Sequence, residues 1–316
     1  ERTNTQYFRF QYRTLDTATG SHWQRLLGSV WSAPTSVGAD KIFVIKREDG
    51  GPGRSVANEH KMHRHIIQIL HGDDNNRLRP NIPHCEGFLS HNATAWDQML
   101  PRFPKGYTGC NALVSEKIPP LSRDIRKLLA QKFHPDMDPD EIADSLTNSH
   151  CLMETLGLDL QEYAVAMAEA LAFLHWSAKV DANDVEFVLA NIRKPQASPG
   201  EDPSKSSLGP ADFHSNAFGS HAMWILDFDC CRTMTLDSNG IKQACRSFWR
   251  NDPYYPRPGS DNAKDKELWD VFRAQFLRSS DEILSGEGED VRRLPQELIE
   301  CIEETKGRFT KGTDFW

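Results

Sequence analysis

Long hydrophobic runs are missing from this chain, and so is an apolar signal-peptide core near residue 1. No stretch approaches the roughly 18 apolar residues needed to span a bilayer. The first eleven residues are polar and aromatic instead. These absences argue against an integral membrane protein and against a membrane partner. We therefore expect a cytoplasmic location.

Cysteine motifs are also missing, because the seven cysteines are scattered, odd in number and form no CxxC pair. The pairs His63–His65 and Cys230–Cys231 do not supply the clustered ligand spacing that structural zinc requires. The pattern is typical of free, mostly buried thiols in a reducing compartment. We expect no metal and no cofactor.

An excess of positive charge is lacking as well. The chain has 37 basic and 45 acidic residues, which gives a net charge of −8 and argues against nonspecific coating of nucleic acid. A local basic face is still present on a predicted helix over 122–133, where Arg123, Arg126, Lys127 and Lys132 gather. These residues are candidates for tRNA contact; the alternative is a solvated helix face.

The order of predicted elements separates two parts. Strands are predicted over 22–32, 41–47 and 111–118, with a helix over 55–70, and Pro119-Pro120 ends this first part. Helices then follow over 122–133, 159–176, 238–249, 263–277 and 295–306, with short strands over 184–190 and 222–229. We expect a mixed N-terminal part, residues 1–118, and a helical part, residues 119–316. A Pro/Ser/Gly-rich flexible insertion is expected at about 195–220.

Several charged residues follow the layout of a protein kinase. Lys46 ends a strand and Glu59 lies on the next helix, as does the kinase lysine–glutamate pair. Asp181 follows the His175 loop, and Asp227 begins an Asp-Phe-Asp turn where kinases have Asp-Phe-Gly. Each feature alone is weak, because a strand ending in lysine is common. Their shared order predicts an α+β, protein-kinase-like bilobal fold with a small mixed N-lobe and a larger, mainly helical C-lobe.

The phosphate-transfer equipment is incomplete. A glycine-rich loop should precede Lys46, because backbone N–H groups must approach the phosphates closely, yet only Gly28 and the stretch 32–38 are available. Glu186 stands where kinases have the magnesium-binding asparagine. We therefore expect weak or no binding of Mg-ATP.

Acidic residues concentrate at two loop–strand junctions. The kinase-like layout would bring them to one cleft, with Asp181, Asp184, Glu186 and Asp227 as catalytic candidates and Glu186 and Asp229 as ligands of a cationic substrate. Glu186 and Asp229 are the preferred guanidinium ligands, because each replaces a neutral kinase residue by a negative charge. The alternative is a set of loop caps together with one satisfied buried network, because caps and turns also favour aspartate.

A proline-stiffened aromatic segment follows the helix predicted over 238–249. Its residues Asn251, Asp252, Tyr254 and Tyr255 are substrate-binding candidates, since exposed aromatic rings stack on bases and side chains. The alternative is a rigid loop whose tyrosines pack on the helical part.

These pieces together resemble a known family. The segments His175-Trp176, Asp181–Leu189, Trp224–Phe228 and Asn251–Pro258 are similar to a fungal domain family of unknown function, often labelled zinc-finger proteins. The resemblance extends from about Gly28 to Leu298. The family includes the arginine-containing cyclodipeptide synthases, which take aminoacyl groups from charged tRNA.

The resemblance implies an aminoacyltransferase that forms cyclo-arginyl dipeptides, with charged tRNA, including arginyl-tRNA, as partner. The always-charged guanidinium of arginine matches carboxylates bidentately, which suits an acidic site. The aminoacyl ester is already activated, so the reaction requires neither ATP nor zinc, and a carboxylate or a histidine can take the amine proton. The rival interpretations are a kinase-like small-molecule phosphotransferase and a catalytically dead scaffold.

Overall fold

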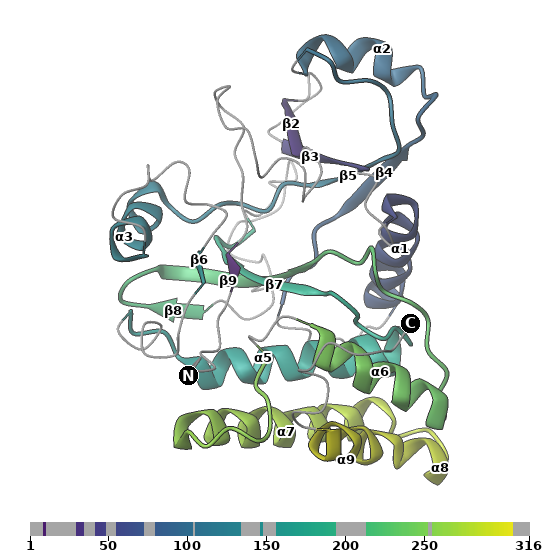
Figure 1. Cartoon of the computed structure of the whole chain (residues 1–316), viewed down its shortest axis with the longest axis vertical. Helices are drawn as coiled ribbons and strands as arrows, with labels where there is room; N and C mark the ends of the chain where they lie inside the picture. Colours follow the sequence, from purple (N-terminus) through teal and green to yellow (C-terminus); the bar gives the residue numbers. More distant parts are fainter. Residues whose placement is uncertain are drawn as a thin grey trace, which may run out of the picture.

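The computed structural model describes residues 9–10, 30–34, 42–48, 55–72, 80–103, 105–133, 146–147, 156–193, 213–251 and 255–305. In this part of the chain, three small antiparallel sheets lie on one side of a group of packed helices (Figure 1). The α+β class expected from the sequence is confirmed.

The largest sheet contains four antiparallel strands. In spatial order these are β2 (Val30–Pro34), β3 (Ile42–Arg47), β5 (Ala112–Glu116) and β4 (Cys85–Leu89). Helix α1 (Val56–Gly72) packs beside β4 and β5. Ser55 begins this helix, because its hydroxyl accepts a hydrogen bond of 3.2 Å from the Asn58 backbone N–H. The expected helix and the strands expected over 41–47 and 111–118 are present. Of the strand expected over 22–32, residues 22–29 lie outside the described residues, and β2 covers 30–34. Strand β4 was not predicted.

A short helix beyond this sheet fixes the end of β3. It comprises α2 (Ala95–Met99) and a 3-10 turn (Leu100–Arg102), neither of which was predicted. The Arg47 guanidinium lies 5.2, 5.4 and 4.8 Å from the ring centroids of Trp96, Phe103 and Tyr107. Cation–π contacts of this kind are strongest where water is excluded, and Arg47 is largely buried. They anchor the residue that follows Lys46.

The second sheet is three-stranded, with β9 (Gly219–Leu226) between β7 (Glu186–Ala190) and β8 (Phe213–Ser215). A third, two-stranded sheet pairs β1 (Arg9–Phe10) with β6 (Leu146–Thr147). The flexible insertion was expected to extend to about 220, but residues 213–220 form β8 and its turn into β9. Residues 194–212 of the expected insertion lie outside the described residues.

The remaining helices are α3 (Arg123–Phe133), α5 (Leu160–Ala172) with a π-helical turn (Phe173–Ser177), α6 (Ser238–Arg250), α7 (Ala263–Ile283), α8 (Glu289–Arg292) and α9 (Leu294–Thr305). Among them, α5, α6, α7 and α9 pack together, whereas α3 lies beside the sheets, away from α7 and α9 (Figure 1). Asp159 caps α5, with its carboxylate accepting from the Gln161 and Glu162 backbone N–H groups. No described helix is both long and apolar enough to cross a membrane.

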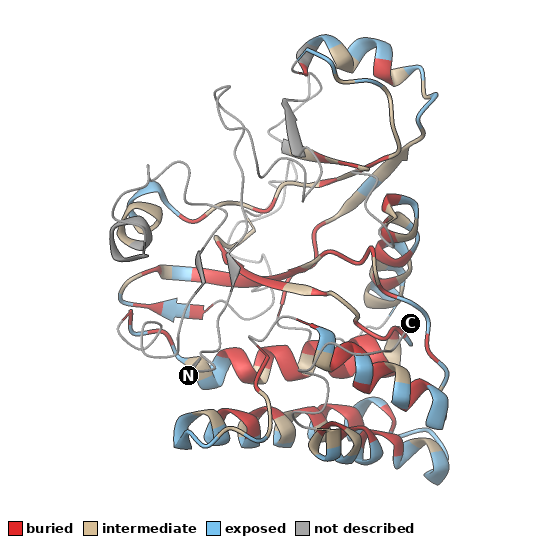
Figure 2. Cartoon of the chain, viewed as in Figure 1, coloured by how far each residue is buried: buried red, intermediate tan, exposed pale blue. Residues whose placement is uncertain are grey.

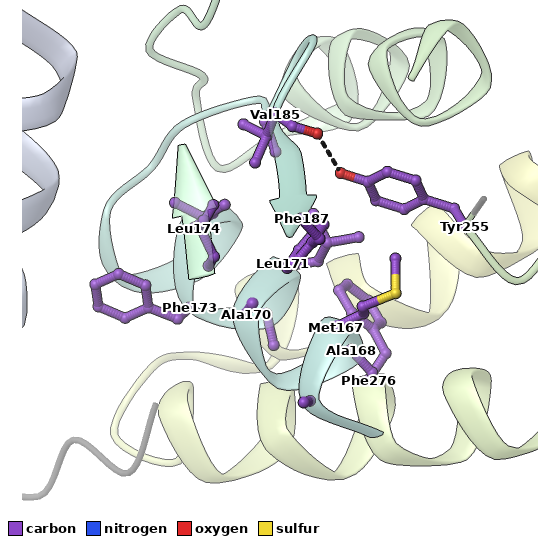
Figure 3. Close-up of a cluster of buried hydrophobic side chains, with 14 of the residues drawn as sticks. Met167, Ala168, Ala170, Leu171, Phe173, Leu174, Val185, Phe187, Tyr255 and Phe276 are labelled. Atoms are coloured by element: carbon purple, nitrogen blue, oxygen red, sulfur yellow. Dashed lines mark hydrogen bonds between the residues drawn. The ribbon is translucent and has the colours of Figure 1, made fainter. Parts of the chain in front are cut away.

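Helix α5 is the centre of the main core. It lies between the β7–β9 sheet and α7, and it is buried along most of its length (Figures 1 and 2). Its buried alanines, Ala164, Ala166, Ala168, Ala170 and Ala172, lack bulk, so neighbouring elements approach closely. Larger side chains such as Met167, Leu171 and Phe276 fill the remaining space (Figure 3).

The connection after β5 joins the four-stranded sheet to the rest of the molecule. Asn191 donates from its backbone N–H to Pro119 O (2.9 Å) and from its side-chain amide to Pro120 O (2.6 Å). Arg193 binds Glu116 through two hydrogen bonds of 2.9 and 2.7 Å. Because both carbonyls and the Glu116 carboxylate are occupied, this connection is held to the end of β7.

Candidate functional site: an acidic cluster around Lys46

Lys46 lies where three elements meet. Its ammonium is 2.8 Å from Glu59 Oε2 on α1 and 2.6 Å from Asp227 Oδ1, directly after β9. Strand β3 carries the lysine, and the cap at Ser55 places Glu59 in the first turn of α1. The structure therefore contains the lysine–glutamate pair suggested by the sequence, and it adds an ion pair with Asp227.

Four carboxylates and one thiol gather beside Lys46 in two groups. In each group, ligand atoms of the members lie within 4.8 Å of one another: Glu59, Asp227 and Asp229 form the first, and Asp184, Asp229 and Cys230 the second. Glu59, Asp227 and Asp229 are each at most 5% exposed. Asp229 belongs to both groups. We call these five residues, together with Lys46, the acidic cluster.

The charges in the acidic cluster shift one another's protonation. Burial lowers the pKa of Lys46, but Glu59, Asp227 and Asp229 more than offset it, so that the pKa is raised above its usual range. For Glu59, burial is the largest effect and raises the pKa, Lys46 opposes it, and Asp227 adds to it. The cluster thus keeps Lys46 charged and favours a proton on Glu59. Such a site favours a further positive charge.

Asparagine side chains fix the turn that carries Asp229. The Asn58 amide donates to Asp229 O (2.8 Å) and Cys231 O (2.9 Å), and the Asn183 amide donates to Cys230 O (3.2 Å). Sequence reasoning missed both asparagines. Asn58 stands next to Glu59 in the sequence. An ordinary exposed asparagine in the first turn of a helix would look the same, so the role of Asn58 could not be recognised from the sequence.

Asp181, expected to be catalytic, is engaged by several hydrogen-bond donors. Its carboxylate accepts hydrogen bonds from the Asn183 and Arg232 backbone N–H groups (3.2 and 2.9 Å) and from the Gln243 side chain (2.8 Å). Burial, only partly offset by these donors, raises the pKa of Asp181. Its Oδ1 joins the two loops and its Oδ2 accepts from Gln243 on α6, so this side chain anchors the loops to each other and to the helix. For Asp181, these hydrogen bonds fit the alternative interpretation, in which the carboxylate serves as a loop cap.

Glu186 belongs to neither group of the acidic cluster, so its expected role in guanidinium binding stays a prediction. It is the first residue of β7 and pairs with Leu226 in the sheet register. Of the five carboxylates expected to converge, the structure brings together Asp184, Asp227 and Asp229. The unforeseen member is Glu59, which the sequence suggested only as a partner of Lys46.

His175 is a buried neutral side chain. Its Nδ1 lies 2.9 Å from Val180 O, and burial lowers its pKa to about 4. The side chain is 3% exposed within the π-helical turn after α5. It therefore supports the loop that follows and cannot reach a substrate amine as a base.

Two described residues of the segment after α6, Asn251 and Tyr255, pack inward. Tyr255 is 2% exposed, and its hydroxyl donates to Val185 O at 3.0 Å (Figure 3). The Asn251 side chain is 3% exposed and hydrogen-bonded to the loop at 182–184. Neither side chain can serve as the exposed substrate contact that was expected. Asp252 and Tyr254 lie outside the described residues.

The basic helix face lies on α3, away from α1 in Figure 1. Arg123 is exposed, and Arg126 and Lys127 are partly exposed. The side chain of Lys132 lies outside the described residues. Contact between this basic face and tRNA stays a prediction.

Residues with an uncommon, left-handed backbone conformation gather around this site. Lys179, Ala182, Asp184 and Asp227 have φ values of 53°, 52°, 63° and 66°, and they are the described non-glycine residues in the left-handed region. Each costs about 1–2 kcal/mol relative to ordinary backbone. All four lie in the two loops that carry the acidic cluster or support it. Strain of this kind persists where the surroundings enforce it, commonly at functional sites.

Comparison with known proteins adds one observation. Residues 223–288 match the model of a family of unknown function described as "Zinc finger protein". The match covers about a fifth of the chain and includes Asp227, Asp229 and Asn251. No curated protein matches the chain.

The description of that family raises the question of zinc. Structural zinc sites use four cysteine or histidine ligands in a tetrahedron. Among the described residues, the groups that could hold a metal are the two carboxylate-rich sets of the acidic cluster, with Cys230 as their one thiol. Such a donor set suits a hard cation rather than a zinc finger. The described residues therefore do not fit the zinc site that the description implies.

Proposed function

We propose that this chain is an aminoacyl-tRNA-dependent cyclodipeptide synthase that forms cyclo-arginyl dipeptides on a kinase-like bilobal scaffold. The observation that carries the proposal is the acidic cluster, in which the described residues bring four carboxylates and one ammonium together. A guanidinium offers five donors in a planar fork that matches paired carboxylates. The resemblance described above supports arginine as the cation.

The kinase-like part of the proposal rests on the partners of Lys46. The ammonium of the strand lysine lies 2.8 Å from the carboxylate of the helix glutamate and 2.6 Å from that of the aspartate after β9. This is the pairing that positions phosphates in kinases. In the proposed synthase the same pairing holds α1 and the Asp227 turn together, so that Asp229 and Asp184 are kept side by side.

The reaction requires positioning and proton transfer. The α-amine of one aminoacyl group attacks the ester carbonyl of the second; a C–N bond forms, the ester C–O bond breaks, and the proton passes through a base to the departing tRNA 3′ oxygen. Repetition with the second amine closes the ring. We assign guanidinium binding to Asp229, the member of both groups, and amine deprotonation to Asp184, which is partly exposed.

A phosphotransferase is the second candidate, because the ion pairs of Lys46 favour it. The connection after β5 argues against it. A purine docked there would need free backbone donors and acceptors, but prolines 119 and 120 have no N–H and their carbonyls bind Asn191. The Glu116 N–H donates to His84 O. Titration calorimetry with Mg-ATP should show no binding at micromolar affinity, and micromolar binding would favour the phosphotransferase.

The proposal is tested by product identity. The protein is incubated with amino acids, tRNA and arginyl-tRNA synthetase, and the products are analysed by mass spectrometry. We expect a cyclic dipeptide that contains arginine and that is lost when ribonuclease is added. Failure to form it with a full set of charged tRNAs would reject the synthase.

A further inference from the structure

The segment after α6 reaches back to the loop that carries Asp184. The Asp184 backbone N–H donates to Asn251 Oδ1 at 2.6 Å, and Asn251 Nδ2 donates to Ala182 O at 2.9 Å. Four residues later, the Tyr255 hydroxyl donates to Val185 O (Figure 3). Three polar groups of the loop at 182–185 are thus held from a segment more than 60 residues away in sequence.

This loop needs to be held because its backbone is strained. Ala182 and Asp184 both have left-handed φ values, 52° and 63°, although neither is glycine. An unrestrained loop would relax towards ordinary φ values. That relaxation would rotate the Asp184 side chain away from Asp229 and Cys230. In the structure, the ligand atoms of these three residues lie within 4.8 Å of one another.

Asn251 is itself held firmly. It is buried, and its carbonyl accepts a hydrogen bond of 2.6 Å from Arg257 Nη2. The Arg257 guanidinium lies 5.2 Å from the Trp249 ring centroid. Since the amide uses both its acceptor and its donor on the loop, the carboxamide is the side-chain group that fits this position.

We propose that Asn251 is a positioning residue that holds the strained loop at 182–184 and thereby keeps Asp184 beside Asp229. Tyr255 and Arg257 complete this clamp, which gives the proline-rich aromatic segment a role other than stacking on substrate. The inference rests on the proposed function only where it concerns catalysis; the holding of the loop stands on geometry alone.

The first experiment measures the loop itself, in the full chain, by hydrogen exchange. Asn251→Ala should speed exchange of the Asp184 amide by about tenfold or more, the ratio that one buried hydrogen bond supports. Adding Ala182→Gly should recover part of the protection, because glycine adopts positive φ without strain. Asn262→Ala, which removes a comparable cap bond at the start of α7, is the matched control and should leave the loop unchanged.

Asn251→Asp keeps the acceptor for the Asp184 N–H but places an oxygen against Ala182 O. It should therefore speed exchange of the Asp184 amide less than Asn251→Ala does. This variant replaces Asn251→Ala in the experiment if the alanine variant does not fold. Protection in Asn251→Ala or Asn251→Asp equal to that of the Asn262 control would overturn the proposal. Equal effects of Asn251→Ala with and without Ala182→Gly would also overturn it, since the strain would then play no part.

The second experiment measures cyclodipeptide formation. Asn251→Ala should lower kcat by about tenfold or more while KM for charged tRNA stays within about twofold, because a displaced base affects the chemical step. Ala182→Gly should restore part of kcat. An inactive wild-type protein would reject the proposed function and leave the exchange result to decide the clamp. An active wild type with unchanged kcat in Asn251→Ala would reject the positioning role.

Discussion

At the scale of single residues, the acidic cluster depends on Lys46. Its ammonium neutralises part of a buried group of carboxylates, and its side chain as a whole is 21% exposed. Removing one partner from a buried ion pair is costly because the other charges keep their desolvation penalty. The lysine therefore stabilises the fold as well as the site.

Lys46→Met should lower the free energy of unfolding by about 3 kcal/mol. This is the low end of the range for breaking a buried ion pair, because the Lys46 side chain is partly exposed. Denaturant unfolding measures this difference. Lys61→Met, the same change at an exposed position of α1, should stay within about 0.5 kcal/mol of wild type. Equal losses in both variants would show that the cluster does not depend on its cation.

Two buried histidines predict how stability changes with pH. Burial lowers the pKa of His63 and of His175 to about 4 in the folded protein. The unfolded chain takes up these protons near pH 6.5. Unfolding therefore binds protons between pH 6.5 and 4, and stability falls as the pH falls through that window.

The double variant His63→Gln with His175→Asn should flatten this part of the pH profile. Each amide preserves a donor near the histidine nitrogen that faces Pro83 O or Val180 O but does not titrate. Urea unfolding at several pH values between 4 and 7 provides the comparison. A slope unchanged from wild type would mean that other groups control the acid response.

At the scale of elements, α6 illustrates how tertiary contacts override helix propensity. Asp237 caps this helix by accepting from the Asn239 and Gly240 backbone N–H groups. A methyl group at Gly240 would lie 1.8 Å from Thr235 O. The chain that enters the helix therefore passes too close for any side chain.

Gly240→Ala should destabilise the protein by about 1–3 kcal/mol through this clash, although alanine is the better helix former. Asn239→Ala, at the exposed neighbouring position, should change stability by less than about 0.5 kcal/mol. Thermal unfolding of both variants distinguishes them. A gain in stability for Gly240→Ala would show that the entry to α6 adjusts freely.

The elements also show what the sequence could predict. Helices α1, α5, α6, α7 and α9 were found because apolar spacing and caps such as Asp159 are local signals. Strand β4 and helix α2 carry weak periodicity and form through contacts with β5 and Arg47. The burial of Tyr255 depends on Val185, 70 residues away, so the segment could not be distinguished from an exposed loop.

The difference between local signals and tertiary contacts also decides which residues of the site could be predicted. The order of Lys46, Glu59, Asp181 and Asp227 indicated which loops would meet, and Lys46, Glu59 and Asp227 do meet. Asp181 and Glu186 have the same charge and lie nearby in sequence, yet one is consumed by backbone donors and the other begins a strand. Sequence position does not reveal which hydrogen bonds a carboxylate already makes.

At the scale of the whole molecule, the negative net charge means that the proposed contact with tRNA has to be local. If α3 contacts the tRNA backbone, Arg123→Glu with Lys127→Glu should raise KM for charged tRNA and flatten its salt dependence by about two counterions. Lys266→Glu, an exposed charge reversal on α7, is the matched control. A KM equal to that of the control across a salt series would exclude α3 as the tRNA surface.

We propose that the acidic cluster binds an arginine guanidinium delivered by tRNA. The most direct measurement compares cyclo-arginyl product formation from purified arginyl-tRNA and other charged tRNAs by wild type, Asp229→Asn and Asn262→Ala. We predict product from wild type and from Asn262→Ala, and a loss of about a hundredfold for Asp229→Asn, the ratio expected when a desolvated guanidinium loses a carboxylate partner. No arginine-containing product from wild type, or equal rates for Asp229→Asn and wild type, would contradict it.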